Sequence, residues 1–380
     1  MPALFDPTLD SFAINRESIY RELRDNHPVY HDIGRDTWVL SRFEDVRRAA
    51  MDTETFSSDA SEAGVLLPML NYLDAPRHGQ LRRLVSRAFT PSRVANMEGL
   101  VQQTVDKLLD RYIARGGGDL IANFSGPLAA NVVGSLIGIP EDEIDDFREL
   151  TDRLLLVGQQ GDTAELAEVA MGIYAMFKTL LDLRRAEAED DLMSALVHVQ
   201  SEGGISDEEV LGFCFLLVGG GNDTTSNLIA NGWLLLLDHS DQLKTIEDDR
   251  SQLPNAIEEM LRLRPPAESH ARTTVRSVEM HGTTVPKGSR VQLLWGSANL
   301  DEREFPLPER FDITRSARHL TFGLGPHFCM GAALGRLEAR IAFEGLLDRA
   351  SQYVVSEPPA RLPSPWAYAF EAVNLAPQTQ

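Results

Sequence analysis

One cysteine lies in a glycine-rich stretch whose residue types are suited to binding a metal. Residues 322–331 read FGLGPHFCMG, so Cys329 follows two glycines, Gly323 and Gly325. Because glycine adopts positive φ readily, we expect these glycines to form a tight bulge whose amides point at the sulfur. Apolar spacing predicts a helix over 332–347. Amides and a helix N-terminus both stabilise a thiolate, so a metal-binding sulfur is one interpretation of this loop.

A buried free cysteine in a turn is the alternative, since cysteine is among the most buried residue types. However, Phe-Gly-x-Gly-x-His-x-Cys-x-Gly closely resembles the haem-binding loop of the cytochrome P450 family, and every fixed position of that pattern is present. By this resemblance Cys329 is the thiolate ligand of the haem iron and Phe322 packs near the sulfur. His327 would reach a haem propionate, and Gly331 would let the following helix approach the porphyrin.

A second pair of candidate residues, His78 and Arg82, lies four positions apart. On a helix they share a face, where such a pair is most often solvated surface. The surrounding pattern Asp-x-Pro-x-His-x-x-x-Arg resembles the family's second haem contact. The resemblance implies that both side chains bind a propionate, an anion that two basic groups suit. Arg272 occupies the position of another propionate-binding arginine.

The long apolar run that follows Ser206 predicts a helix extending to about Leu237. Its start fits a capping box in which Ser206 and Glu209 each bond the other's backbone amide. Its middle contains three consecutive glycines at 219–221. Each costs roughly 1 kcal/mol relative to alanine in a helix, so we expect a local break there. A loop between two ordinary helices is the alternative.

Residues 220–225 resemble the family's oxygen-activation motif, Gly-Gly-x-Asp-Thr-Thr. The resemblance implies that Gly220 and Gly221 lie beside the haem and that Thr224 donates a hydrogen bond to dioxygen. Asp223 would relay protons from solvent. An acid and a hydroxyl at adjacent positions suit such a proton route.

Other segments predict supporting structure. Glu259 and Arg262 are spaced i, i+3, and such a pair is usually on the surface. However, the Glu-x-x-Arg pattern resembles the family's structural ion pair, whose third partner would come from the Pro308–Phe311 segment. Upstream of Arg272, we expect Ala267, Glu268 and His270 to project toward the haem edge, where the acid would affect substrate polarity. The spacing at 29–40 predicts a β-hairpin, and Ser41 to Glu44 fits a capping box for a helix from Arg42 to about Met51.

The resemblance implies a mainly α fold with a smaller β region, that is, the cytochrome P450 fold with haem between the long helix and the cysteine-loop helix. Its 380 residues are 43% hydrophobic and show no clear boundary, so we expect a single domain over 1–380. Acidic residues exceed basic ones by 21, which argues against nucleic acid. Only two cysteines occur, and neither a secretory signal nor a membrane anchor is visible, so we expect a soluble, cytoplasmic protein.

The resemblance implies a haem b monooxygenase that inserts one atom of O2 into a lipophilic small molecule. Because the chain lacks a dinucleotide glycine fingerprint and further cysteines, electrons from NAD(P)H would arrive through a ferredoxin or flavodoxin and its reductase. A basic docking patch is expected, or else scattered intramolecular pairing, at Arg83, Arg87, Arg336 and Arg340. Two alternatives remain: a peroxide-driven haem peroxygenase, which has less need of Asp223 and Thr224, and a haem-thiolate sensor or carrier without catalysis.

Overall fold

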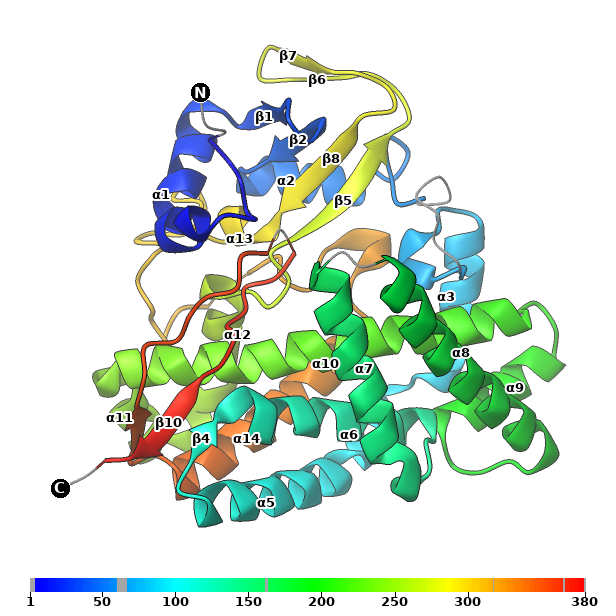
Figure 1. Cartoon of the computed structure of the whole chain (residues 1–380). Helices are drawn as coiled ribbons and strands as arrows, with labels where there is room; N and C mark the ends of the chain where they lie inside the picture. Colours follow the sequence, from blue (N-terminus) through cyan, green and yellow to red (C-terminus); the bar gives the residue numbers. More distant parts are fainter. Residues whose placement is uncertain (1–3, 60–66, 161–162, 317, 365, 379–380) are drawn as a thin grey trace.

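One long central helix, α10 (Asp207–Asp238), runs through the helical part of the fold, as Figure 1 shows. The computed structural model describes residues 4–59, 67–160, 163–316, 318–364 and 366–378. The other helices in these residues are α1 (Asp10–Asn26), α2 (Phe43–Met51), α3 (Arg77–Ala88), α4 (Pro91–Asn96), α5 (Glu98–Ala114), α6 (Gly126–Ile137), α7 (Ile144–Gln160), α8 (Thr163–Ala186), α9 (Leu192–Ser201), α11 (Ser240–Asp248), α12 (Leu253–Leu263), α13 (Trp295–Ala298) and α14 (Ala332–Arg349).

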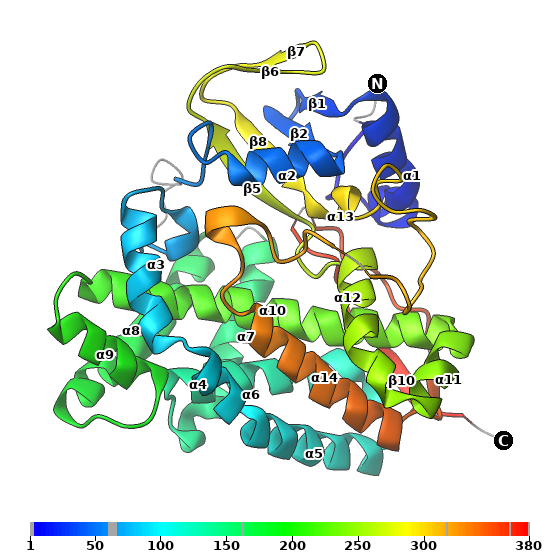
Figure 2. The ribbon, with the colours of Figure 1, turned by 180° about the vertical axis from the view of Figure 1, so that it is seen from behind.

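The strands form a smaller layer on one side of the helices (Figures 1 and 2). The main sheet has the order β1-β2-β8-β5-β3, and the others are β4-β10-β9 and β6-β7. The strands are β1 (Val29–Asp32), β2 (Thr37–Leu40), β3 (Phe56–Ser57), β4 (Gly118–Asp119), β5 (Ser269–Thr274), β6 (Val278–Met280), β7 (Thr283–Val285), β8 (Arg290–Leu294), β9 (Tyr353–Val355) and β10 (Asn374–Pro377). The predicted hairpin at 29–40 is confirmed, because β1 pairs antiparallel with β2.

Helix α10 begins at the predicted capping box. The Glu209 amide donates to Ser206 Oγ (3.2 Å), and the Ser206 amide donates to Glu209 Oε2 (2.9 Å). The expected break at the three glycines is wrong, because one α-helix runs through them. Packing explains this result: a Cβ on Gly221 would lie 2.6 Å from Val133 Cγ2 of α6, so glycine lets the two helices approach closely. Such burial outweighs the weak helix propensity of glycine.

The capping box predicted at Ser41 is also wrong. Helix α2 begins one residue later than expected, at Phe43, and no side-chain cap bond forms. The Phe43 amide donates instead to Asp301 Oδ2 (2.9 Å), a residue far along the chain. A tertiary contact therefore provides the acceptor for a backbone amide at the helix N-terminus, where a local capping motif was expected to provide it.

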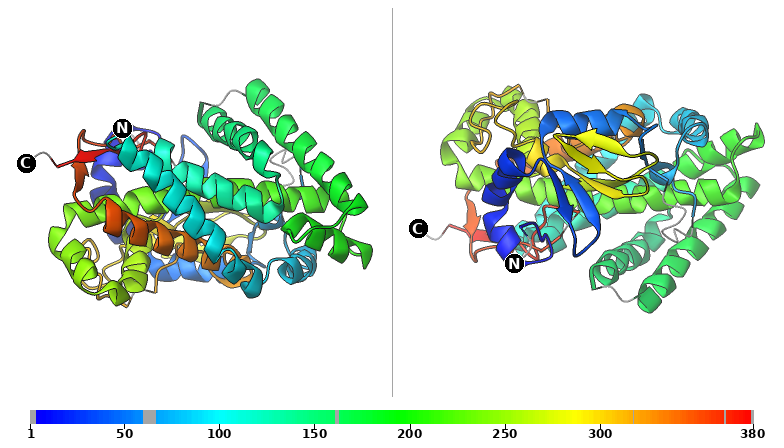
Figure 3. Two further views of the ribbon diagram at one scale, coloured as in Figure 1. Left: turned by 90° about the horizontal axis from the view of Figure 1, so that it is seen from below. Right: turned by 90° about the horizontal axis from the view of Figure 1, so that it is seen from above.

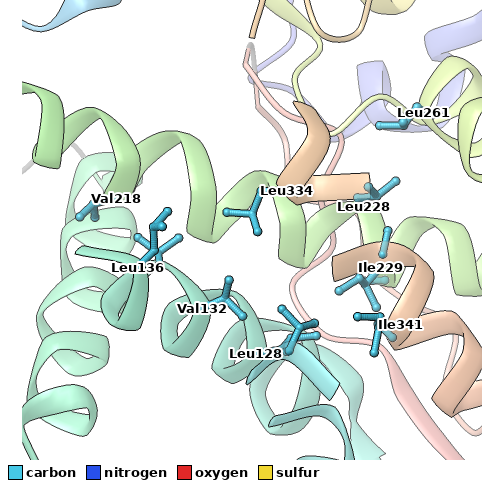
Figure 4. Close-up of a cluster of buried hydrophobic side chains, with 14 of the residues drawn as sticks. Leu128, Val132, Leu136, Val218, Leu228, Ile229, Leu261, Leu334 and Ile341 are labelled. Atoms are coloured by element: carbon cyan, nitrogen blue, oxygen red, sulfur yellow. The ribbon is translucent and has the colours of Figure 1, made fainter. Parts of the chain in front are cut away.

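Apolar side chains of α6, α10, α12 and α14 interlock beneath the sheet and form the core around the central helix (Figure 4). Members drawn there are Leu128, Val132 and Leu136 of α6, Val218, Leu228 and Ile229 of α10, Leu261 of α12, and Leu334 and Ile341 of α14. Seen from below, α5 runs alongside α14, which packs on α10, while α7 and α8 extend to one side (Figure 3). No helix among the described residues is both long and apolar enough to cross a bilayer.

Candidate active site

The cysteine loop has the backbone that its glycines predict. Gly323 and Gly325 have φ of 68° and 71°, in the left-handed region that favours glycine. The Cys329 amide donates to the Phe322 carbonyl (2.8 Å), which closes the loop just before α14. Cys329 retains accessible surface although protein groups surround its sulfur, and the predicted helix start is confirmed at Ala332. The loop therefore holds this sulfur at the N-terminus of a helix that packs on α10.

The surroundings of the Cys329 sulfur differ from the expectation. Burial raises the thiol pKa, and the Gly331 amide, Arg82, Arg336 and the Ala332 amide lower it without reversing the direction. The Gly323 amide does not point at the sulfur, because it donates to the Leu320 carbonyl (2.8 Å). The hydrogen bonds that favour a thiolate thus come from the start of α14, with two arginines as the nearby positive charges.

Two histidines from distant parts of the chain stack beside the loop. The rings of His78 and His327 have centroids 4.1 Å apart. His327 Nε2 lies 3.1 Å from the hydroxyl of Ser58, whose amide donates to Asp74 Oδ1 (2.9 Å). Burial, and then the charge of His78 itself, lowers the His327 pKa to about 3, so this imidazole is neutral. No sequence motif includes Ser58, and its contact with His327 is visible only in the folded chain.

Two arginines complete a cluster of basic groups around these histidines. Arg82 donates from Nη2 to the Phe328 carbonyl (2.6 Å) of the cysteine loop. Arg272 is buried and affects the pKa of both His78 and His327, so it lies close to them. Burial lowers the pKa of both arginines. Four basic side chains from α3, β5 and the cysteine loop therefore converge, as the resemblance implies. They are His78, Arg82, Arg272 and His327, and they form a cationic cluster whose charge comes from the two arginines.

Unpartnered polar atoms show what this cluster suits. His78 Nε2 and Arg272 Nε are buried and make no hydrogen bond within the described residues. Leaving buried donors unsatisfied is costly, and basic groups crowded together repel one another. An anion with several acceptor oxygens, such as a pair of carboxylates, would satisfy both demands. The cluster therefore fits the propionates of a haem.

The middle of α10 presents an open face next to two polar side chains. A Cβ on Gly219 or Gly220 would meet no atom within 4 Å, although α10 is buried on either side of them. Gly221 instead packs against Val133 of α6, whereas Gly219, which was not among the predicted residues, borders the same open space as Gly220. Small residues on an open helix face leave room for a flat cofactor, and the accessible thiol supplies a soft metal ligand.

Thr224 and Asp223 follow this open face directly. The Thr224 hydroxyl donates to the Gly220 carbonyl at 2.5 Å, one turn earlier. Burial raises the pKa of Asp223, and a hydrogen bond from Asn227 Nδ2 to its Oδ1 (3.0 Å) opposes that rise. Asp223 is thus a carboxyl that keeps its proton to a higher pH than an exposed aspartate does.

Glu268 does not project toward the haem edge, so that expectation is wrong. Its carboxylate accepts from Arg16 Nε (2.8 Å) and from the Tyr20 hydroxyl (2.5 Å), both on α1. A buried acid requires such partners. Glu268 therefore anchors the N-terminal helix. Glu259 and Arg262 form a fully buried pair (2.7 Å), and Arg262 also donates to the Pro308 carbonyl, which matches the structural role expected.

The four arginines of the expected basic patch are mostly neutralised by neighbours. Arg87 pairs with Glu202, Arg336 with Glu258, and Arg340 with Glu98 and Glu344. Arg83 is exposed and forms no ion pair with any residue in the described ranges. It borders a cavity of about 430 Å³ that His78, Arg82 and Gly325 also line. Intramolecular pairing thus accounts for three of the four residues.

An accessible cysteine thiol, a cationic cluster suited to carboxylates and a glycine-lined helix face together fit a haem in this fold of mixed α and β type. Comparison with known proteins agrees: the family model described as Cytochrome P450 matches residues 159–360. Cytochrome P450 130 of Mycobacterium tuberculosis is 38% identical over 89% of each chain. Cytochrome P450 monooxygenase PikC of Streptomyces venezuelae is 37% identical over 96% of this chain and 91% of its own.

Solved structures show the same relationship across nearly the whole chain. CYP109Q5 from Chondromyces apiculatus superposes with a TM-score of 0.92 at 32% identity, covering 99% of this chain and 98% of its own. CYP109E1 from Bacillus megaterium, solved with testosterone, gives 0.89 at 30% identity, covering 96% and 100%. The chain belongs to the cytochrome P450 family. It is a haem-thiolate monooxygenase whose cofactor is haem b.

Proposed function

We propose that Cys329 is the iron ligand and that His78, Arg82, Arg272 and His327 bind the haem carboxylates. The observation that carries this assignment is the accessible thiol beside buried basic groups whose donors lack protein partners. The amides of Gly331 and Ala332 donate to the Cys329 sulfur. These hydrogen bonds would stabilise the negative charge of a thiolate that binds iron. When bound, haem supplies the activation of O2 that places one oxygen atom in the substrate and reduces the other to water.

We further propose that Asp223 and Thr224 deliver protons to the open face of α10. Burial raises the pKa of Asp223, so its carboxyl holds a proton to a higher pH than an exposed aspartate does and can pass that proton on. Thr224 is oriented by its bond to the Gly220 carbonyl, which fixes its hydroxyl oxygen next to the open space at Gly220. Because the hydroxyl hydrogen is engaged with that carbonyl, the oxygen is positioned to accept a hydrogen bond from a protonated group in the open space, while Asp223 supplies the proton.

The substrate that we propose is a lipophilic small molecule of polyketide or steroid size. A relative 34% identical over 92% of each chain is named 6-deoxyerythronolide B hydroxylase, and the CYP109E1 structure contains testosterone. Glu268, the acid that the sequence placed near the pocket, lies in an ion-pair network instead. No carboxylate from that position therefore opposes an apolar ligand.

A small electron-transfer protein, a ferredoxin or flavodoxin with its reductase, is the proposed source of electrons. Arg83 supports this, because it is an exposed cation on an acidic protein and borders the cavity next to the cysteine loop. Arg83 alone, without an ion pair in the described ranges, provides less positive charge than the predicted patch of four arginines. It would therefore act mainly by raising the association rate of an acidic partner through long-range electrostatic attraction. A reducing cytoplasm is the compartment we propose, since both cysteines are free.

The test compares two ways of driving the same oxidation. In Asp223→Asn, turnover with O2 and a reductase system should fall by roughly 10²-fold, the usual contribution of a positioned proton donor. Turnover with hydrogen peroxide, which brings its own protons, should change far less. Equal loss by both routes would contradict the proton-delivery role. High peroxide activity that exceeds the O2 route in the unmodified protein would favour the peroxygenase.

A further inference from the structure

A histidine outside the four proposed carboxylate ligands contacts the indole of a buried tryptophan. Trp295 Nε1 lies 2.8 Å from His270 Nδ1. Trp295 is buried and begins α13, directly after strand β8, which pairs with the strand that carries His270. Both residues are thus fixed by the main sheet rather than by a loop. The pair joins two rigid elements close to the cationic cluster.

This contact determines where the imidazole carries its proton. The indole N–H only donates, so His270 Nδ1 must accept. The ring is therefore neutral with its hydrogen on Nε2, because an imidazolium would present a second donor to Trp295. Burial and then the neighbouring Arg272 charge lower the His270 pKa to about 4, in agreement with that geometry. His270 is thus a neutral hydrogen-bond donor at Nε2.

The donor faces open space beside the cationic cluster. Positions 270 and 272 share a face of β5, because side chains alternate along a strand. His270 has a large accessible surface, yet burial is the main cause of its lowered pKa. Protein therefore surrounds the residue, and its ring borders an open space inside the protein. His270 also contributes to the lowered pKa of His327, which places it near the stacked histidines. An acceptor bound there would be an oxygen of an anion.

We propose that His270, oriented by Trp295, donates its Nε2 hydrogen to a carboxylate of the bound haem. A neutral donor suits this place, because the cluster already contains two arginines that repel further positive charge. Trp295 acts as a positioning residue that keeps the hydrogen on the nitrogen facing the cofactor. The inference rests on the proposed function, since it assumes haem held by Cys329.

The experiment measures haem transfer from purified holoprotein to excess apomyoglobin at pH 7 without added substrate. His270→Leu should release haem about tenfold faster, the factor that corresponds to about 1.4 kcal/mol. His270→Gln retains an N–H donor and should stay within about twofold of the unmodified protein. Trp295→Phe should lie between them. In resonance Raman spectra, the propionate bending band should shift in His270→Leu and in Trp295→Phe. The haem midpoint potential should change in the same two variants.

His31→Leu is the matched control, since His31 also packs on a tryptophan, Trp38, with ring centroids 4.3 Å apart on the β1–β2 hairpin. Its release rate should equal that of the unmodified protein, and an equal acceleration would overturn the inference. Unchanged release and an unchanged Raman band in His270→Leu would also overturn it. If the unmodified protein bound no haem or lacked thiolate ligation, the proposed function would fail instead.

Discussion

Asp223 shows how one local contact sets the chemistry of a residue. Its carboxyl is buried, which raises its pKa, and it accepts a side-chain hydrogen bond from Asn227, which favours the charged form. These two effects oppose each other. Together they set the pKa of Asp223, and this pKa determines the pH above which the carboxyl no longer holds a proton to deliver.

We therefore predict a shift in the pH profile of Asn227→Ala. Removing the donor takes stabilisation from the carboxylate, so the Asp223 pKa rises further. Turnover that depends on a proton at Asp223 falls as pH rises through that pKa, so the alkaline limb should move to higher pH. The measurement is kcat against pH with O2 and reductant. A limb that stays in place or moves to lower pH would contradict the assignment, and Asp223→Asn, which lacks the limb, serves as the reference.

At the scale of the element, α10 combines packing and function within three adjacent glycines. Gly221 permits α6 to approach, whereas Gly219 and Gly220 face open space. The sequence predicted the helix and its capping box, yet it predicted a break at these glycines. It could not show that α6 packs there, and that contact is why the helix continues.

The glycines should respond differently to an added methyl group. Gly221→Ala places a Cβ 2.6 Å from Val133 Cγ2, so it should lower the free energy of unfolding by about 1–3 kcal/mol through overpacking. Gly220→Ala meets no neighbour and should raise it by up to about 1 kcal/mol, since alanine favours helix. Urea unfolding measures both. Only Gly220→Ala should reduce O2-driven turnover without loss of stability, and a stability loss at both positions would disprove this division.

At the scale of the molecule, the sequence predicted what depends on local pattern. The hairpin, the start of α14 and the left-handed glycines of the cysteine loop all follow from spacing and residue type. Features that depend on distant partners were missed. Glu268 is held by Arg16, more than 250 residues earlier in the chain.

The same limit applies to the site. Sequence motifs identified the basic residues that converge on the cysteine loop, because the family's pattern carries them. Trp295 and Ser58 belong to no motif, and only the folded chain brings them to His270 and His327. Likewise, pairing of Arg87, Arg336 and Arg340 with acids depends on tertiary contacts that no periodicity reveals.

The most direct measurement is the absorption spectrum of the ferrous carbonyl complex of the holoprotein. We predict the red-shifted Soret band of a thiolate-ligated haem, and its loss in Cys329→His. Cys214→Ser is the matched control: this other cysteine is buried, and burial raises its pKa to about 12, so the band should not change. An imidazole-type band in the unmodified protein, or a thiolate band that persists in Cys329→His, would contradict the account.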